Sequence, residues 1–300
     1  MGQMRIWVTG CGGFLGSRLV KVFTALGHAV IGLSRRKCQF NSRTVCLDLA
    51  GEKAFKQLHD LVKDVGLPDV IVHAASLKPG PYALSDYVKS NVLTTANLLD
   101  MVNQFPPRQF IYTSTLSVYG RPERNPVKEA DPINGNFPYA ITKWWAEQLL
   151  EPFQRQCQIM ILRLPSLYGA GQDDSFIDGL ARLAMRNEAI ELYDKGEVVR
   201  DALHVEDIVG AIVSCATSPP CGQFLRFNLG CGKPVTARRY VEELLTVFKS
   251  SSRVLPVNKP SPQPFDLYGD IQEAQKQIGF KPTPLPASME RYASELRARQ

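Results

Sequence analysis

Tyr139 and Lys143 are the two residues of this sequence whose types and spacing best suit catalysis. They lie four positions apart in a stretch with a helical pattern, so their side chains are expected on one helix face. An ammonium beside a phenol favours the phenolate and is expected to lower the tyrosine pKa from about 10 toward neutral pH. A tyrosine in that state can exchange a proton with a substrate oxygen. Of the ten tyrosines, Tyr139 alone has a lysine four positions on, although chance can also produce that spacing.

A glycine-rich loop near the N-terminus predicts a nucleotide site. The apolar segment 5–9 is followed by a loop in which Gly10, Gly13 and Gly16 are three positions apart. Glycines here permit a tight turn, let the backbone approach a pyrophosphate and let the following helix pack closely on the strand. A plain strand-to-helix turn could contain the same glycines. The position of the loop in the first strand–helix unit favours dinucleotide binding.

The end of the second strand distinguishes between the two nicotinamide cofactors. NAD usually meets an acidic residue there, which binds the ribose 2′-hydroxyl, whereas a 2′-phosphate requires cations. This chain has Ser34, Arg35 and Arg36 instead of an acid. A hydroxyl and two guanidiniums suit a phosphate, so we predict NADP(H) rather than NAD(H). The alternative is that two surface arginines simply end a strand.

The elements that must position these residues alternate between strand and helix, as in a parallel sheet wrapped by crossover helices. The expected strands are 5–9, 29–34, 44–47, 69–74, 109–113 and 159–164, and the expected helices are 15–26, 52–64, 84–104 and 138–156. After residue 168 the pattern loosens, prolines cluster, and a final helix is expected over 287–299. We therefore predict an α/β protein with a dinucleotide-binding domain over 1–168, to which some later segments return. Residues 169–300 are expected to form mainly a smaller, irregular α/β substrate lobe.

Composition excludes several other classes of protein. The 300 residues are 44% hydrophobic and 21% charged, and the net charge of +6 is scattered, so neither disorder nor a nucleic-acid surface is indicated. We expect no membrane-spanning segment and take a cytoplasmic location as the default. The seven cysteines form no Cys-x-x-Cys pair and have no histidine at ligand spacing, so we expect no bound metal.

Ordered motifs along nearly the whole chain resemble the extended short-chain dehydrogenase/reductase family, in particular its NAD(P)-dependent sugar-nucleotide epimerase/dehydratase branch. The resemblance implies a Rossmann-type doubly wound sheet. The motifs are the glycine loop, Asp48-Leu49, His73 to Lys78, Asn91 at the opening of a helix, Phe110 to Gly120, Tyr139 with Lys143, Leu162 to Gly169, Val199 to Asp207, and Phe227 to Gly232.

The resemblance assigns roles to individual residues. It makes Thr115 the hydroxyl that binds the substrate oxygen, Tyr139 the acid–base and Lys143 the group that binds the nicotinamide ribose. With the glycine loop and the arginine segment, it gives a cofactor set of Gly10, Gly13, Phe14, Leu15, Gly16, Ser34, Arg35, Arg36, Asp48, Leu49, Ala74, Ala75, Ser76, Lys78, Asn91, Thr113, Tyr139, Lys143, Pro165 and Leu167. The substrate is expected to contact Thr115, Ser166, Arg200 and Asp266.

Two departures from the family pattern narrow the chemistry. Family dehydratases carry an acidic pair directly after the catalytic hydroxyl, but here Leu116 and Ser117 follow Thr115. Without those carboxylates, elimination lacks its acid and base, and decarboxylation lacks its Glu. Where relatives often clamp the substrate diphosphate with an arginine, this chain has Gln263. Either Arg200 acts alone, or the ligand is not a sugar nucleotide.

The leading hypothesis is therefore an NADPH-dependent reductase of a nucleotide-linked 4-keto-6-deoxy-sugar. One alternative is a UDP-hexose 4-epimerase that retains NAD, and another is a non-catalytic NADP-binding sensor or scaffold. The resemblance also implies a homodimer formed through helices 84–104 and 138–156. Trp144 and Trp145 enlarge the apolar surface of the second helix, although burial against the small lobe would explain them equally well.

Overall fold

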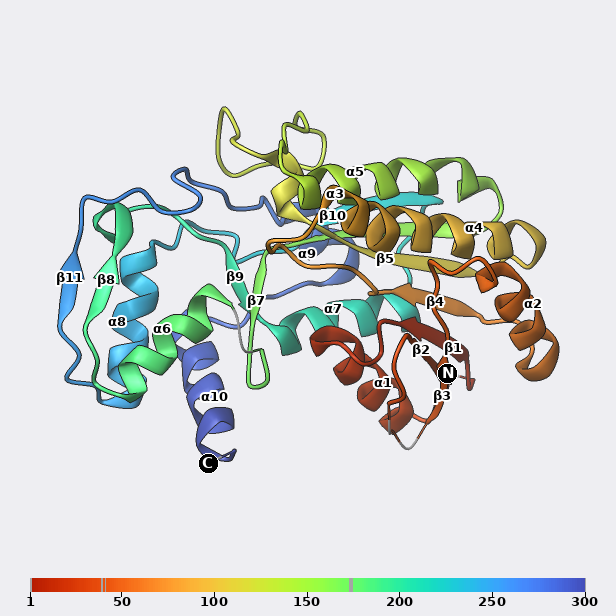
Figure 1. Cartoon of the computed structure of the whole chain (residues 1–300), viewed down its shortest axis with the longest axis horizontal. Coiled ribbons are helices and arrows are strands. Elements are labelled where there is room, and N and C mark those ends of the chain that lie inside the picture. The colour runs from red at the N-terminus through yellow and green to blue at the C-terminus, as the bar shows by residue number, and fades with distance from the viewer. Residues whose placement is uncertain (1, 39, 41, 173–174, 300) are drawn as a thin grey trace. The chain divides into compact units, whose positions relative to one another are not determined.

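The computed structural model describes residues 2–38, 40, 42–172 and 175–299, and its centre is a seven-stranded sheet (Figure 1). The strand order is β10-β6-β5-β4-β1-β2-β3, and β1 pairs in parallel with both β2 and β4. The strands are β1 (Arg5–Thr9), β2 (Ala29–Ser34), β3 (Arg43–Cys46), β4 (Val70–His73), β5 (Gln109–Thr115), β6 (Gln158–Leu164) and β10 (Phe224–Asn228). The predicted α/β class and Rossmann-type sheet are confirmed. The chain reverses its direction of progress across the sheet between β1 and β4, where such sheets bind ligands at their carboxyl edge.

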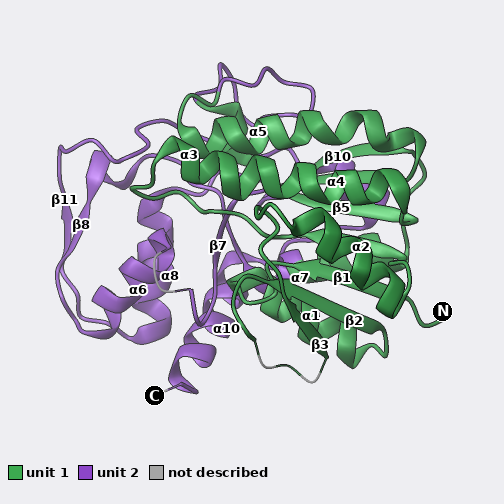
Figure 2. Ribbon diagram, turned by 45° about the vertical axis from the view of Figure 1, so that its right-hand side comes forward, with its two compact units in different colours: residues 1–120, 135–163, 209–227 green, residues 121–134, 164–208, 228–300 purple. Residues whose placement is uncertain are grey.

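Helices cover both faces of this sheet (Figures 1 and 2). On one face lie α2, α4 and α5, and on the other lie α1 and α7. The bounds are α1 (Phe14–Ala25), α2 (Ala54–Val65), α3 (Leu84–Tyr87), α4 (Thr94–Gln104), α5 (Pro138–Leu150) and α7 (Val205–Thr217). Gly27 follows α1 with a φ of 83°, as expected of a residue that stops a helix.

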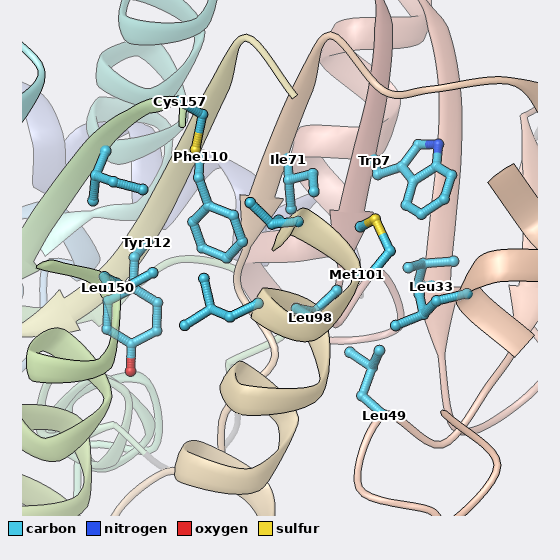
Figure 3. Packing of buried hydrophobic residues seen from close by; sticks show 14 of the residues in the cluster. Trp7, Leu33, Leu49, Ile71, Leu98, Met101, Phe110, Tyr112, Leu150 and Cys157 are labelled. Carbon is cyan, nitrogen blue, oxygen red and sulfur yellow. The ribbon is translucent and has the colours of Figure 1, made fainter. Parts of the chain in front are cut away.

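The core on the α4 side consists of side chains from alternate strand positions. Trp7, Ile71 and Phe110 come from neighbouring strands and pack with Leu98 and Met101 of α4 (Figure 3). All five are fully buried. The strands and the helix are therefore held in register by apolar contact, and the strand ends at the carboxyl edge are fixed with them.

Two predicted helices differ from the structure. The expected helix 84–104 is interrupted by a π-helical segment, Val88–Leu93, between α3 and α4. The expected helix 138–156 ends at Leu150 and continues as a 3₁₀ turn, Glu151–Arg155, because Pro152 has no N–H for the helical ladder. Strand β5 extends two residues beyond the expected end, to Thr115, and all seven of its residues are buried.

The chain divides into two compact units (Figure 2). Unit 1 comprises residues 1–120, 135–163 and 209–227 and contains the sheet, whereas unit 2 comprises 121–134, 164–208 and 228–300. The elements of unit 2 are β7 (Ser166–Tyr168), α6 (Phe176–Met185), β8 (Ile190–Leu192), β9 (Ala202–His204), α8 (Ala237–Phe248), β11 (Val254–Pro256), α9 (Gln272–Ile278) and α10 (Leu285–Arg297). Its core includes Tyr168, Ile177, Tyr240 and Tyr292.

Two further surface properties bear on the sequence expectations. Among the described residues, no helix combines the length and the apolar character needed to cross a membrane. Trp145 is 47% exposed on α5, whereas the ring of Trp144 lies 5.8 Å from the guanidinium of Arg163. The homodimer stays a prediction.

Candidate active site

The glycine loop is pressed against the end of β4. Gly10 has a φ of +68°, and a Cβ atom there would lie 2.8 Å from the backbone of Ala75. A Cβ on Gly16 would lie 2.2 Å from the main-chain oxygen of Gly10. Gly13 precedes α1 without a side-chain cap, so the first N–H groups of that helix are available to an anion. Glycine is therefore required at Gly10 and Gly16 for steric reasons, as expected of a pyrophosphate loop.

A cavity of about 640 Å³ lies beside this loop in unit 1. Ten of the expected cofactor residues line it: Gly10, Gly13, Ser34, Arg35, Arg36, Asp48, Leu49, Ala74, Ala75 and Ser76. The cavity is also lined by residues that the sequence reasoning missed: Leu33, Leu47, Ala50, Leu77, Tyr82, Asp86, Lys89, Ser90 and Thr94. Leu33 and Leu47 lie at or just after the carboxyl ends of β2 and β3, so the strand-end rule could have found them. No such signal marks Lys89, because its place depends on the π-helical segment.

The two arginines are among the residues that line this cavity. Arg35 and Arg36 follow β2 and are exposed, and the main-chain N–H of Arg36 donates to Ser34 Oγ at 3.3 Å. Within the described part of the chain, neither guanidinium has a hydrogen-bond partner. Leu49 is buried, and its main-chain oxygen accepts from Asn97 Nδ2 at 2.7 Å. The arrangement suits the adenosine end of a dinucleotide, with two cations free to contact a phosphate.

A buried histidine fixes the loop after β4. His73 Nδ1 lies 2.7 Å from Thr9 Oγ1, and Nε2 lies 3.0 Å from Thr95 Oγ1. Thr9 Oγ1 also accepts from the N–H of Ala75 at 3.0 Å, and Thr95 donates to the main-chain oxygen of Asn91 at 2.7 Å. These partners assign the ring proton to Nε2. Burial lowers the His73 pKa to about 3, with Lys143 contributing, so the ring is neutral.

Asn91 connects that loop to the catalytic helix. Its Oδ1 accepts from the N–H of Leu77 at 2.8 Å, and its Nδ2 donates to Thr142 Oγ1 at 3.0 Å. The expectation that Asn91 opens a helix was wrong, because it lies inside the π-helical segment Val88–Leu93 and is 1% exposed. Asn91 therefore acts as a structural bridge between the β4 loop and the residue before Lys143.

The three expected catalytic residues come together at the end of β5. Thr115, the last residue of β5, and Ser76, from the loop after β4, both hydrogen-bond to the hydroxyl of Tyr139 on α5. Burial raises the Tyr139 pKa to about 12, although these two hydrogen bonds oppose the shift. Ser76 was expected only as a cofactor residue, so its contact with Tyr139 is new.

Lys143 is buried, with a side chain that is 1% exposed. Its Nζ donates to the main-chain oxygen of Thr113 at 2.5 Å and lies 4.1 Å above the ring of Tyr112. Burial lowers the Lys143 pKa to about 7, and the Glu147 carboxylate opposes this. The expectation that Lys143 would lower the Tyr139 pKa is not met in this structure, because burial of the phenol outweighs the other contributions and the ammonium points to Thr113.

The remaining cofactor residues of unit 1 do not line the cavity. Phe14 and Leu15 begin α1, and the Arg18 guanidinium lies 4.2 Å from the Phe14 ring. Lys78 is exposed in the loop after β4. Among the described residues, no group of three or more His, Cys, Asp or Glu side chains could hold a metal ion.

The expected residues of unit 2 form a separate set. Ser166 is exposed on β7, between the half-buried Pro165 and Leu167. The Arg200 guanidinium donates to Ser261 Oγ at 2.8 Å and to the main-chain oxygens of Phe265 and Gln263. Asp266 Oδ1 accepts from the N–H of Val199 at 2.8 Å. The structure thus brings Arg200 and Asp266 to one loop, where part of the guanidinium is already engaged.

Comparison with known proteins places this arrangement in a family. The model of the NAD dependent epimerase/dehydratase family matches residues 6–230. A probable UDP-glucuronate 4-epimerase of Rhizobium meliloti is 26% identical over 93% of this chain and 93% of its own.

Two solved structures are similar over nearly their whole length. The protein MoeE5, solved with UDP-glucuronic acid and NAD, is 27% identical with a TM-score of 0.86 and full coverage of both chains. The UDP-glucose 4-epimerase of Thermotoga maritima shares the fold with a TM-score of 0.89 over 99% of each chain, at 22% identity. The chain therefore belongs to the NAD dependent epimerase/dehydratase family of extended short-chain dehydrogenases/reductases, and it is an NAD(P)-dependent enzyme.

Proposed function

We propose that this protein is a 4-epimerase of a UDP-linked sugar and keeps its nicotinamide cofactor through turnover. The proposal rests on one observation. The hydroxyls of Thr115 and Tyr139 contact each other, and the two residues that follow Thr115 carry no carboxylate. Leu116 is buried, and Ser117 uses its N–H to bind Thr115 Oγ1 at 3.1 Å. A site of this kind can move a proton and position a hydroxyl, but it has no acid–base pair for elimination.

Three side chains would perform the chemistry of this reaction. Thr115 binds the oxygen at the reacting carbon, and Tyr139 exchanges a proton with that oxygen in each direction. Because its pKa is raised, Tyr139 carries its proton at neutral pH and is suited to protonate a carbonyl oxygen. Hydrogen bonds from Thr115 and Ser76 stabilise the phenolate that remains.

A bound nicotinamide dinucleotide would supply the hydride acceptor and donor. The glycine loop would hold its pyrophosphate, Asp48 and Leu49 would contact the adenine, and Lys143 would bind the nicotinamide ribose. NAD accompanies UDP-glucuronic acid in the MoeE5 structure, which supports a retained cofactor and a UDP-sugar substrate. The names of the relatives thus favour the epimerase alternative over the reductase that led the sequence-based hypotheses.

Net reduction of a keto-sugar by NADPH is the second candidate. It is supported by Arg35 and Arg36, which are exposed beside the cavity with no acidic residue at the end of β2. A reductase must exchange its cofactor in every cycle, and the 2′-phosphate of NADPH would engage those cations. The two candidates share the catalytic residues and differ in whether the cofactor leaves.

One experiment separates the candidates. The purified protein is denatured, the released nucleotide is identified by chromatography, and the native protein is incubated with UDP-glucose, UDP-galactose or UDP-glucuronate without added cofactor. We expect bound cofactor and conversion of one of these sugars to its C4 epimer, and we expect Tyr139→Phe to abolish the conversion. A protein that contains no cofactor and oxidises NADPH only on addition of a 4-keto-sugar nucleotide would instead be a reductase. Equal turnover by Tyr139→Phe would refute the mechanism in either case.

Contact of Ser166, Arg200 and Asp266 with substrate, and of Pro165 and Leu167 with cofactor, is also a proposal. It rests on the family resemblance and on the exposed position of Ser166. If Arg200 binds the diphosphate, Arg200→Ala should raise KM for the UDP-sugar much more than it lowers kcat. An unchanged KM would remove Arg200 from the substrate set.

A further inference from the structure

A fully buried ion pair lies one helical turn beyond Lys143. Glu147 is 0% exposed and Arg163 is 1% exposed. Arg163 Nη2 donates to Glu147 Oε2 at 2.7 Å, and Arg163 Nε donates to Oε1 at 3.1 Å. Arg163 Nη1 also donates to the hydroxyl of Tyr119 at 2.6 Å. The pair is thus bidentate and further anchored in unit 1, and its two members come from α5 and β6.

The same carboxylate binds the catalytic end of β5. Ser114 Oγ donates to Glu147 Oε1. Consecutive residues of the strand segment Thr113–Thr115 therefore contact three residues of α5 that are spaced four apart, namely Lys143, Glu147 and Tyr139. Because a helix presents residues at this spacing on one face, a single stripe of α5 holds the strand end by three polar contacts.

Glu147 is also the charge that acts most directly on Lys143. Its carboxylate raises the Lys143 pKa against the effect of burial. The neutral His73 of β4 and the Tyr112 ring of β5 also face the ammonium. Arg163 of β6 is linked to it through the ion pair with Glu147. A buried ion pair gives little stability relative to well-packed apolar residues, so stability alone does not account for its presence beside a catalytic lysine.

We propose that Glu147 is a positioning residue for Tyr139 and Lys143, holding the end of β5 through Ser114 and placing a carboxylate one helical turn from the Lys143 ammonium. The proposal rests on the roles assigned to Tyr139 and Lys143 above. Its electrostatic part concerns the protein alone and can be measured without substrate.

The test follows the titration of Lys143 by NMR of protein labelled with ¹³C in its lysine side chains. The Lys143→Met variant identifies the resonance. We expect a wild-type midpoint near the Lys143 pKa of about 7, and a midpoint lower by about one unit or more in Glu147→Gln. In Glu147→Gln the buried positive charge of Arg163 also loses its partner, and this charge should lower the Lys143 pKa further. An unchanged midpoint in folded Glu147→Gln would overturn the proposal.

Two matched variants complete the test. Ser114→Ala keeps both charges and removes the strand contact, so we expect an unchanged midpoint, a several-fold lower kcat and an unchanged KM.

If Glu147→Gln does not fold, the double variant Glu147→Gln/Arg163→Met removes both buried charges, and its midpoint should still be lower than in the wild type. A wild-type midpoint in the double variant would show that Glu147 does not hold the charge of Lys143. Because the titration needs no turnover, failure of the epimerase assay would not affect this result.

Discussion

Lys143 Nζ on α5 donates a 2.5 Å hydrogen bond to the main-chain oxygen of Thr113 on β5, two residues before Thr115. This contact ties the catalytic helix to the strand that supplies the catalytic hydroxyl. Tyr139 and Thr115 thus come from a helix and a strand of unit 1, and Ser76 comes from the loop after β4. Side chains held in this way lose little entropy on ordering and can maintain the geometry that proton transfer needs.

Ser76 should influence the pKa of Tyr139. Its hydrogen bond lowers that pKa, so Ser76→Ala should raise it further above the present value of about 12. At a fixed pH below the pKa the phenolate fraction falls, and we expect the rate of substrate oxidation to fall roughly 2- to 10-fold, as for the loss of one hydrogen bond. The rise of this rate with pH should move to higher pH. Ser85→Ala, at an exposed serine of α3, serves as the control, and coincident pH profiles would contradict the prediction.

The arginine segment should determine the choice of cofactor. We expect Arg35→Ala/Arg36→Ala to weaken NADPH binding by about 10- to 100-fold, as for loss of charge-assisted hydrogen bonds, and to leave NADH binding nearly unchanged. Protein that has first been freed of bound nucleotide is titrated with each cofactor, and the change in protein fluorescence measures the ratio. Lys37→Ala removes a neighbouring exposed cation that does not line the cavity, and it should leave the ratio as it is. Equal losses for both cofactors would mean that the arginines do not read the 2′-phosphate.

The sequence was sufficient for the parts of the site that depend on local pattern. The predicted bounds of strands 5–9 and 29–34 agree with the structure at every residue. The first apolar run is followed by a glycine and the second by a charged residue, so both ends are visible in the sequence. The glycine loop was predicted from its place after the first strand, and the structure adds that Gly10 lies against Ala75 where the strand order reverses.

The rest could not be predicted because it depends on contacts between distant segments. The π-helical turn around Asn91 has no marker in its own residues and is stabilised by bonds to Leu77 and Thr142. The pairing of Glu147 with Arg163 joins a helix to a strand, and helical spacing alone does not reveal it. The pKa of Tyr139 depends on how deeply the hydroxyl is buried, which is a property of the packed site.

Two glycine substitutions should have opposite effects on stability. Gly16→Ala would place a Cβ 2.2 Å from the main-chain oxygen of Gly10, so the loop must shift. We expect a loss of about 1–3 kcal/mol in the free energy of unfolding and loss of cofactor binding. Gly210→Ala lies in α7 with nothing within 4 Å of the new atom, and it should stabilise the protein by about 0.5–1 kcal/mol. Urea unfolding of the two variants measures both effects, and a neutral Gly16→Ala would show that the loop is not sterically constrained.

His73 should make the protein sensitive to acid. Its pKa is about 3 in the folded protein and 6.5 in the reference state, so between these values the unfolded chain binds more protons. The contribution of this group to stability is complete above pH 6.5 and is lost as the pH falls toward 3, at roughly 1.4 kcal/mol per pH unit. An amide can replace both ring contacts without taking up a proton. His73→Gln should therefore remove this part of the slope when urea-unfolding free energies are compared between about pH 7 and pH 4. Because the folded ring stays neutral until the pH approaches 3, its contact with Thr9 persists, and titration of His73 should leave the cofactor affinity of the folded protein unchanged between pH 7 and pH 4. Equal slopes in the two proteins would show that His73 is not the group that titrates.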